Sequence, residues 1–439
     1  MSSLQELQQK INYEKTIDCV QCGYCLPVCP TFETMERETH SPRGRINLVK
    51  MVAEGKADID VLEDPIEKCL GCMACTTVCP SNVQYGQILE GAKDVVEQNK
   101  QKSKPQKGVE NFLFDSFFPS KGWMDTLGNA TWLYQKSGVQ KVARKLNLTK
   151  IAPLNMEHFE KVIPDLPSPK ERKKRANRYI SKRPATAKIA FFTGCVMDSM
   201  FFETNKNTIH LLVKSGAEVI LPKQQTCCGA LHAHSGKVDE SIELAKANIK
   251  AFEEEQVDYI INNAGGCGAR LIEYHHLFEE GSEWHERAKK FVTKVKDITQ
   301  ILVELDQIEY TKPVHKTVTY QPSCHMTNVQ GVIEPPKQLL NKIPGLTLKE
   351  LKRPEFCCGS AGTYNMLQYD ESMKILDMKM EDVCSTKASD VVTTNPGCLL
   401  QMKLGIEREG TTGEMEAVHI VDLLAQAGPV GKWEKETRG

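Results

Sequence analysis

The sequence predicts an α+β protein with a small helical module at its N-terminus, followed by two copies of one α/β domain. Two observations support this prediction. Eight cysteines in the first 80 residues form two runs with identical internal spacing, and further along the chain a pattern of strand, glycine and cysteine occurs twice. We expect a module over 1–100, a helical connector and linker over 101–185, and the duplicated domains over 186–310 and 311–439.

The two cysteine runs have the form Cys-x-x-Cys-x-x-Cys-x-x-x-Cys-Pro, which is the spacing of bacterial-type two-cluster ferredoxins. In that pattern three closely spaced thiolates hold three corners of one cubane [4Fe-4S] cluster, and the fourth thiolate reaches the other cluster. A zinc site needs no such doubled run, so the spacing favours two [4Fe-4S] clusters in a ferredoxin-like module. The expected ligands are Cys19, Cys22, Cys25 and Cys79 for a first cluster, and Cys69, Cys72, Cys75 and Cys29 for a second.

The segment between the runs makes the module larger than a minimal ferredoxin. It contains Ser41-Pro42-Arg43-Gly44-Arg45, and an amphipathic helix is expected to begin at Ile46. A second helix is expected over 87–98. Arg43 and Arg45 have several roles open to them: binding a partner's carboxylates, stabilising a reduced cluster, or acting as ordinary solvated or capping arginines.

The connector has an aromatic-rich, loosely helical stretch over residues 112–134. Such a stretch can dock a partner subunit or rest at a membrane interface, but packing between the two halves of the molecule is the favoured interpretation. Residues 167–175 are rich in proline and charge, which is typical of a linker. We expect this basic run to be a solvated connector and not a nucleic-acid-binding patch.

The duplicated domains follow the linker. In each, strands alternate with helices, which predicts parallel α/β units with the cysteines on loops after strand ends, where open α/β sheets bind ligands. Adjacent glycines let the backbone approach a bulky inorganic group. Four converging sulfurs favour a metal site, occupied by a further iron–sulfur cluster or by zinc. The candidate ligands are Cys195, Cys227, Cys228 and Cys267 in the first repeat, and Cys324, Cys357, Cys358 and Cys398 in the second.

Four other residues near these motifs have no counterpart in the opposite repeat. Cys384 lies within a helical pattern, so we expect a packed thiol. His232 and His234 follow the first Cys-Cys-Gly, and His325 follows Cys324. Because the other repeat matches none of these histidines, we expect structural or hydrogen-bonding roles and not ligation.

The bulk composition limits the setting in which the protein works. The formal net charge is −1, so no overall field favours nucleic acid or an anionic membrane. The polar start of the chain shows no secretory pattern, and 17 cysteines without such a pattern belong in a reducing compartment. No apolar stretch approaches the ~20 residues that span a bilayer. We therefore expect a cytoplasmic protein whose contact with the membrane is at most peripheral.

The eight-cysteine module followed by two Cys…Cys-Cys-Gly…Cys domains resembles the iron–sulfur subunit of bacterial glycolate oxidase. It is also similar to the C-type subunit of anaerobic glycerol-3-phosphate dehydrogenase and to the D-type subunit of heterodisulfide reductase. Ser41-Pro42-Arg43-Gly44-Arg45 resembles the segment after the first run in the glycolate oxidase subunits. Heterodisulfide reductases end this motif in Cys-x-x-Cys, whereas Ala264 and Asn395 stand at its first position here. That departure weakens the disulfide-reductase interpretation and leaves an ordinary cubane cluster, zinc or a vacant thiol site as possibilities in the repeats.

The resemblance implies an iron–sulfur electron-transfer subunit of a flavin-dependent dehydrogenase for glycolate or another 2-hydroxy acid, D-lactate included. It places FAD and substrate oxidation on a partner subunit and leads electrons towards quinone or another acceptor. The chain has no Gly-x-Gly-x-x-Gly after a strand, in keeping with a flavin held elsewhere. Two alternatives stay open: a subunit that itself reduces a disulfide or quinone beside the Cys-Cys pairs, and repeats that form a zinc-held scaffold.

Overall fold

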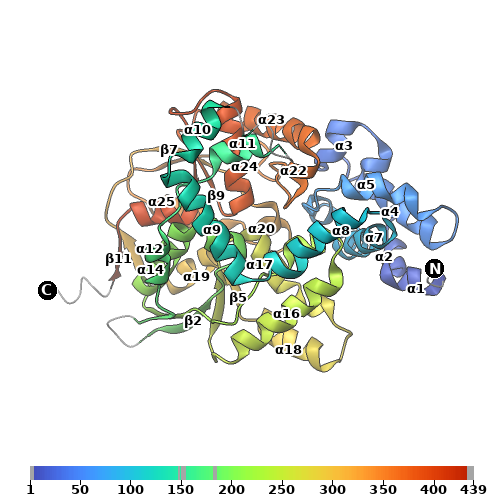
Figure 1. The fold of residues 1–439 in the computed structure, drawn as a ribbon, viewed down its shortest axis with the longest axis horizontal. Coiled ribbons are helices and arrows are strands. Elements are labelled where there is room, and N and C mark those ends of the chain that lie inside the picture. Colours follow the sequence, from blue (N-terminus) through green and yellow to red (C-terminus); the bar gives the residue numbers. More distant parts are fainter. Residues whose placement is uncertain (1–3, 147–148, 150–154, 181–184, 433–439) are drawn as a thin grey trace.

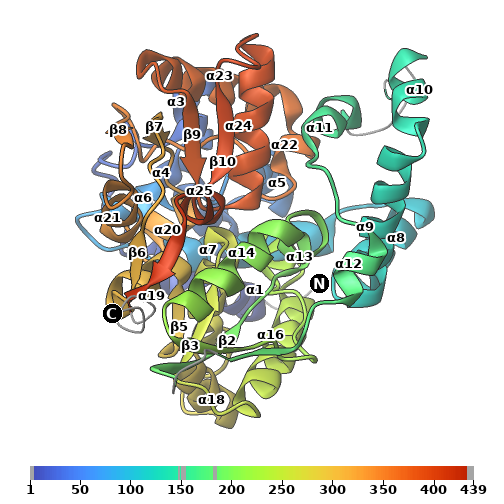
Figure 2. The same ribbon diagram turned by 90° about the vertical axis from the view of Figure 1, so that its left-hand side faces the viewer.

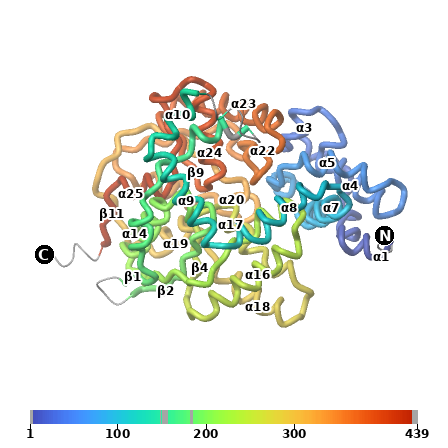
Figure 3. The backbone as a smooth tube through the Cα atoms, in the orientation of Figure 1, coloured from blue at the N-terminus to red at the C-terminus, as the bar shows by residue number. Residues whose placement is uncertain are grey.

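The computed structural model describes residues 4–146, 149, 155–180 and 185–432. It is elongated, with α1 (Leu4–Lys10) at one end and β11 (Pro429–Gly431) at the other (Figures 1 and 3). Between these ends lie the N-terminal module, an arm of helices and two α/β repeats. The mixed helix and sheet architecture agrees with the predicted fold class.

In the described part of the N-terminal module the regular elements are all helices. Its elements are α1, α2 (Tyr13–Thr16), α3 (Pro30–Met35), η1 (Glu38–His40), α4 (Pro42–Ala53), η2 (Ile59–Leu62), α5 (Glu63–Glu67), α6 (Ala74–Thr77) and α7 (Tyr85–Asn99). The first expected helix begins earlier than Ile46, because Pro42 occupies its first turn and the Ser41 hydroxyl accepts a hydrogen bond from the Gly44 N–H. Apolar side chains of α4 and α7 form one buried core beside the cysteine loops.

The connector forms an arm along one side of the molecule (Figure 2). It consists of α8 (Lys104–Asn111), one π-helical turn η3 (Phe112–Phe117), α9 (Lys121–Lys136), α10 (Val139–Lys145), α11 (Met156–Val162) and α12 (Pro169–Lys173). The packing interpretation holds for its inner face, where Phe114 and Met124 are buried. It does not hold for the outer face, where Trp123, Leu127 and Leu133 are exposed.

The basic run at the end of the arm corrects one expectation, because it is not uniformly solvated. Arg175 forms a two-pronged ion pair with Asp198 of the first repeat, and both side chains are largely buried. Arg172 donates to the carbonyl oxygens of Asp198 and Ser199. These arginines therefore fasten the arm to the first repeat.

The first repeat has a five-stranded sheet in the order β1-β3-β2-β4-β5. Its strands β2 (Ala187–Phe191), β3 (Ala217–Ile220), β4 (Tyr259–Asn262) and β5 (Val295–Asp297) are parallel, and β1 (Arg178–Tyr179) pairs antiparallel with β3. Its helices are α13 (Cys195–Met200), α14 (Phe202–Lys214), α15 (Ala230–His234), α16 (Val238–Glu253), α17 (Gly265–Ile272), η5 (Tyr274–Leu277), α18 (Glu283–Val292) and α19 (Ile298–Leu305). The expected domain boundaries stay predictions; β1 lies within the segment expected to be linker.

The second repeat reproduces this topology with the order β8-β7-β9-β10, all parallel. Its strands are β7 (Thr317–Tyr320), β8 (Thr347–Lys349), β9 (Asp390–Thr393) and β10 (Glu416–His419). Its helices are α20 (Cys324–Asn328), α21 (Glu334–Asn341), α22 (Tyr364–Leu367), α23 (Tyr369–Ser385), α24 (Pro396–Arg408) and α25 (Ile420–Gln426). The strands that end the two repeats, β6 (Ile308–Tyr310) and β11, pair antiparallel with each other, so the repeats are joined through a shared sheet and core.

The module docks on both repeats through ion pairs. Arg270 of the first repeat is buried and bonds Glu90 of α7 at 2.9 Å, and Arg353 of the second repeat bonds Glu33 of α3 at 2.6 Å. Lys93 Nζ also donates to the carbonyl oxygen of His234 at 2.9 Å. These contacts set the cysteine loops of the module against those of the repeats. No helix within the described ranges combines the length and apolar character that crossing a bilayer requires.

One buried carboxyl gives a stability prediction. Asp297 caps α19, with Oδ1 accepting from the Thr299 N–H at 2.8 Å, while Oδ2 has no hydrogen-bond partner. Burial raises the pKa of Asp297 to about 6. Because the fold favours the neutral acid, this residue's contribution to stability is full below pH ~4 and falls as the pH rises through about 6, by about 3 kcal/mol in total.

We therefore expect Asp297→Asn, which cannot ionise, to gain stability relative to the wild type as the pH rises. Thermal unfolding of both proteins at pH 5 and pH 7 checks this expectation. The pH dependence of the difference is the observable, because any cost of the new amide is the same at both values. A difference that does not change with pH would contradict the prediction.

Candidate functional site

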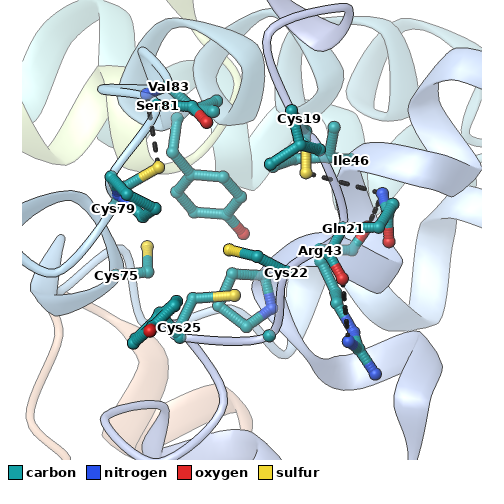
Figure 4. A pocket seen from close by; sticks show the side chains of 16 residues that line it. Cys19, Gln21, Cys22, Cys25, Arg43, Ile46, Cys75, Cys79, Ser81 and Val83 are labelled. Atoms are coloured by element: carbon teal, nitrogen blue, oxygen red, sulfur yellow. Dashed lines mark hydrogen bonds between the residues drawn. The ribbon is translucent and has the colours of Figure 1, made fainter.

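The eight N-terminal cysteines lie in two neighbouring groups. One cavity is lined by Cys19, Cys22 and Cys25 of the first run together with Cys79 of the second, and Cys75 lies at its border (Figure 4). A second cavity is lined by the remaining members, Cys69, Cys72, Cys75 and Cys29. The structure thus brings the cysteines together in the crossed grouping expected from the spacing.

The two cysteine loops share an unusual backbone. In each run, the residue two positions after the first cysteine and the residue directly after the second cysteine have positive φ: Gln21 and Gly23 in one loop, Gly71 and Met73 in the other. Gln21 (φ 57°) and Met73 (φ 59°) bear a steric cost that a glycine would avoid. This conformation curls each loop so that its cysteines face one cavity.

The chemistry of the second group fits an iron–sulfur cluster. Burial raises the pKa of the Cys72 and Cys75 thiols well above the ordinary value, so thiolates at these positions need a bound cation. Burial alone would also raise the pKa of Cys69, but the Arg45 guanidinium brings it below its ordinary value. Iron bound by these cysteines would supply the required positive charge.

Arg45 lies beside this second group and is only 1% exposed. Its Nε donates to the Pro65 carbonyl oxygen at 2.7 Å, its Nη2 donates to the Thr31 hydroxyl at 2.9 Å, and its Nη1 lies 4.0 Å from Cys29 Sγ. Throughout the described part of the chain, no carboxylate forms an ion pair with Arg45. A buried guanidinium without a carboxylate partner is stabilised by another negative charge nearby. An anionic cluster held by the second group would supply that charge.

Arg43 has a different environment. It is partly exposed, pairs with Glu38 at 2.7 Å, and donates from Nη1 to the carbonyl oxygen of Gln21 at 3.1 Å. It therefore braces the loop of the first group through the backbone. The structure separates two arginines that the sequence left equivalent.

Two contacts to the cysteine sulfurs were missed by sequence reasoning. Tyr85 Oη lies 3.3 Å from Cys69 Sγ, and the Val83 N–H donates to Cys79 Sγ at 3.5 Å. Hydrogen bonds to cluster sulfurs tune the reduction potential. In the sequence, these residues were marked only by their position shortly after the second run. Tyr85 is the first residue of α7, and Val83 lies two residues before it.

The cysteines of each repeat also converge. Cys195 Sγ and Cys227 Sγ lie 3.5 Å apart, and the side chains of Cys228 and Cys267 contact each other. In the second repeat the corresponding side-chain contacts join Cys324 with Cys357, and Cys358 with Cys398. Each predicted set of four is therefore one group of sulfurs.

The Cys-Cys-Gly turns are built alike in the two repeats. The Gly229 N–H donates to Cys227 Sγ and the Gly359 N–H donates to Cys357 Sγ, both at 3.5 Å. Gly229 has φ 83°, and a Cβ there would lie 2.6 Å from Ser241 Oγ. A side chain at this position would be both strained and blocked, so the turn requires glycine.

Burial bears on the alternative interpretations. Cys227, Cys228, Cys357 and Cys358 are only 2–3% exposed, so a substrate that approaches from solvent does not contact these side chains directly. Among the residues that the structure describes, no three Cys, His, Asp or Glu side chains are arranged to hold a single metal ion.

Cys384 is half-buried against apolar side chains of the second repeat, as expected of a packed thiol.

The two sets differ in their neighbours. The set of the second repeat lies against the second cavity of the module: Cys72 packs in one apolar cluster with Cys324 and Cys357, and Asn328 Nδ2 donates to the Cys72 carbonyl oxygen at 2.8 Å. The set of the first repeat lies under the arm, where Phe118 and Pro119 line a small cavity with Cys195 and Cys227.

The histidines near the cysteine motifs form hydrogen bonds that join the repeats to the module and to the arm. His325 Nε2 donates to the Gly71 carbonyl oxygen, and His232 Nε2 donates to the Phe114 carbonyl oxygen, both at 2.8 Å. The ring of His234 lies 5.2 Å from that of His325. His325 and His232 thus hold the module and the arm, respectively, against the repeats.

Comparison with known proteins gives a consistent picture along the chain. Residues 15–83 match the 4Fe-4S dicluster domain, residues 105–163 match the linker region of the glycolate oxidase iron-sulfur subunit, and residues 189–272 and 318–403 each match the cysteine-rich domain. The probable glycolate oxidase iron-sulfur subunit of Bacillus subtilis is 47% identical over 96% of both chains. The glycolate oxidase iron-sulfur subunit of Escherichia coli is 26% identical over 93% of both.

A shorter relative and a solved structure add to this comparison. Lactate utilization protein A of Oceanobacillus iheyensis is 35% identical over 54% of this chain and 96% of its own length. A crystal structure of a hypothetical protein from Helicobacter pylori shares the fold, with a TM-score of 0.56 over 97% of this chain and 77% of the other, at 9% identity.

Proposed function

The chain belongs to the glycolate oxidase iron–sulfur subunit family, and from that premise we propose that it conducts electrons away from a flavin-containing partner subunit. The partner, carrying FAD, oxidises glycolate or another 2-hydroxy acid such as D-lactate. The electrons go on to quinone or another acceptor. We place the complex in the cytoplasm, with at most peripheral contact with the membrane.

The observation that carries this proposal is the pair of adjacent cysteine groups that share Cys75 at their border. A reduced flavin releases two electrons. Two [4Fe-4S] clusters held there would each accept one of them. We propose that the first is held by Cys19, Cys22, Cys25 and Cys79, and the second by Cys69, Cys72, Cys75 and Cys29.

The residues around the two groups supply charge, hydrogen bonds and shielding from water. Arg45 places a positive charge against the second group, and Tyr85 contacts its Cys69. The two loops, with their matched positive-φ residues, hold the sulfurs around each cavity. The second repeat closes over Cys72 and keeps water from that side of the group.

Purification of the tagged chain from its own host under anaerobic conditions tests the proposal. We expect a flavin-containing subunit to copurify and the complex to reduce its clusters when glycolate or D-lactate is added. Bleaching of the visible cluster absorption is the measurement. Reduction by glycerol-3-phosphate, with no response to either hydroxy acid, would contradict the proposal.

For the repeats we propose that each set of four cysteines holds a metal centre, either a further cluster or zinc. A cluster is favoured, because the described side chains are not arranged around a single metal ion. We expect Cys228→Ser and Cys358→Ser each to lower the iron or zinc bound per chain, without removing the spectroscopic signals of the two N-terminal clusters. Metal analysis together with electron paramagnetic resonance (EPR) measures both quantities. Unchanged metal content in both variants would show that the sets are vacant thiols.

A further inference from the structure

One cysteine of the chain stands apart in its exposure. All seventeen cysteines lie in described residues, and of these only Cys22 is exposed. The side chains next to it on the same loop are apolar and also exposed: Ile17 is 55%, Val20 67% and Tyr24 67% exposed. We call Ile17, Val20, Cys22 and Tyr24 the Cys22 face.

Three residues of the Cys22 face border the first cysteine cavity. Val20, Cys22 and Tyr24 line that cavity, and all three are exposed on the protein surface. Cys22 lies among the other cysteines of this cavity in Figure 4. Solitary exposed apolar residues are common on protein surfaces, but here several follow one another along a loop that encloses a redox site. The arrangement suits a short path for an electron.

None of the four cysteines of the second group is exposed. Cys29, Cys69 and Cys75 are buried, and Cys72 lies beneath Asn328 and its neighbours in the second repeat. An electron donor outside the molecule therefore approaches the first group more closely than the second. This difference in exposure gives electron transfer a direction, from the first group at the Cys22 face to the buried second group.

The character of the face indicates what covers it. An apolar centre with a tyrosine resembles the core of a protein–protein interface, and small interfaces of this kind are typical of redox partners. The exposed carboxylates of Glu14 and Asp18 lie beside it in the sequence and disfavour an anionic membrane surface. A partner with an apolar patch and a basic rim complements both features.

We propose that the Cys22 face is the docking surface for the flavin-containing subunit, and that electrons enter this chain through the first cluster. The identity of the donor rests on the function proposed above. The position of the entry point rests on the exposure of Cys22, Val20 and Tyr24 around the first cavity and on the burial of the second group, and it can be tested separately.

The docking test compares surface variants of the tagged chain purified from its own host. We expect Ile17→Glu to lower the flavin that copurifies at least tenfold, while iron content and cluster absorption stay at wild-type levels. Ile17 does not line the cavity, so its variant isolates the surface from the cluster. Leu133→Glu, at an equally exposed apolar position on α9, is the matched control and is expected to keep the flavin.

Retention of flavin by Ile17→Glu, or its loss in Leu133→Glu alone, would overturn the docking surface. If the wild type itself carries no flavin, the proposed function fails instead, and the entry point is tested on the isolated chain. A soluble dysprosium chelate added to that chain is expected to speed the EPR relaxation of the first cluster much more than that of the second. Equal enhancement of the two signals would overturn the entry point.

Discussion

Replacing Cys29 by serine is expected to remove the cluster whose other three ligands lie in the opposite run. Cys29 belongs to the first run in sequence but lies in the cavity with Cys69, Cys72 and Cys75. Its Sγ also lies 4.0 Å from Arg45 Nη1. Iron should fall by about four per chain, and the EPR signal that disappears should be that of the second cluster.

The reciprocal variant makes this test specific. Cys79→Ser, in the second run, should remove the signal of the first cluster and leave the other in place. Cys384→Ser serves as the control, because this thiol packs against apolar side chains away from both cavities, and iron should not change. If Cys29→Ser removes the signal of the first cluster and Cys79→Ser removes that of the second, or if both remove the same signal, the crossed grouping is wrong.

The second large effect is expected at Arg45. A reduced cluster carries one more negative charge than an oxidised one, so the buried guanidinium stabilises the reduced state. A unit charge at about 4 Å is worth ~4 kcal/mol at an effective dielectric constant of 20, and ~1.4 kcal/mol corresponds to 59 mV for one electron. Because the charge of a cluster is spread beyond its nearest sulfur, we expect Arg45→Met to lower the potential of the second cluster by about 100 mV.

Arg43→Met is the matched control for this measurement. Arg43 is partly exposed and already paired with Glu38, so solvent and that carboxylate screen its charge. EPR-monitored redox titration of both variants should show a large shift for the second cluster in Arg45→Met and a small one for either cluster in Arg43→Met. Similar shifts in the two variants would mean that burial of Arg45 does not set the potential. Arg45→Lys, which keeps the charge, should recover most of the wild-type value.

Much of the architecture could be predicted because its signals are local. The grouping of Cys29 with the second run follows from spacing alone, and the repeated Cys-Cys-Gly turns predicted two domains that share one strand order. Even the boundary of α4 was signalled by Ser41 and Pro42, although the amphipathic pattern pointed to a later start.

The remainder depends on contacts between segments distant in sequence. The expectation of a solvated basic run was wrong for Arg175, which pairs with Asp198 of the first repeat, a partner that a run of basic residues does not reveal. Arg43 and Arg45 are two positions apart, and only the packing of α4 shows which is buried. The exposure of Cys22 likewise depends on where the repeats cover the module and where they leave it open.

The measurement that tests the central claim most directly is the iron, zinc and acid-labile sulfide content of the anaerobically purified chain. The account predicts at least about eight iron and eight sulfide per chain for the two N-terminal clusters. With clusters in the repeats as well, iron rises to about twelve to sixteen, and with zinc there it stays at about eight and zinc appears. Zinc or iron bound without sulfide would contradict a protein built to carry electrons.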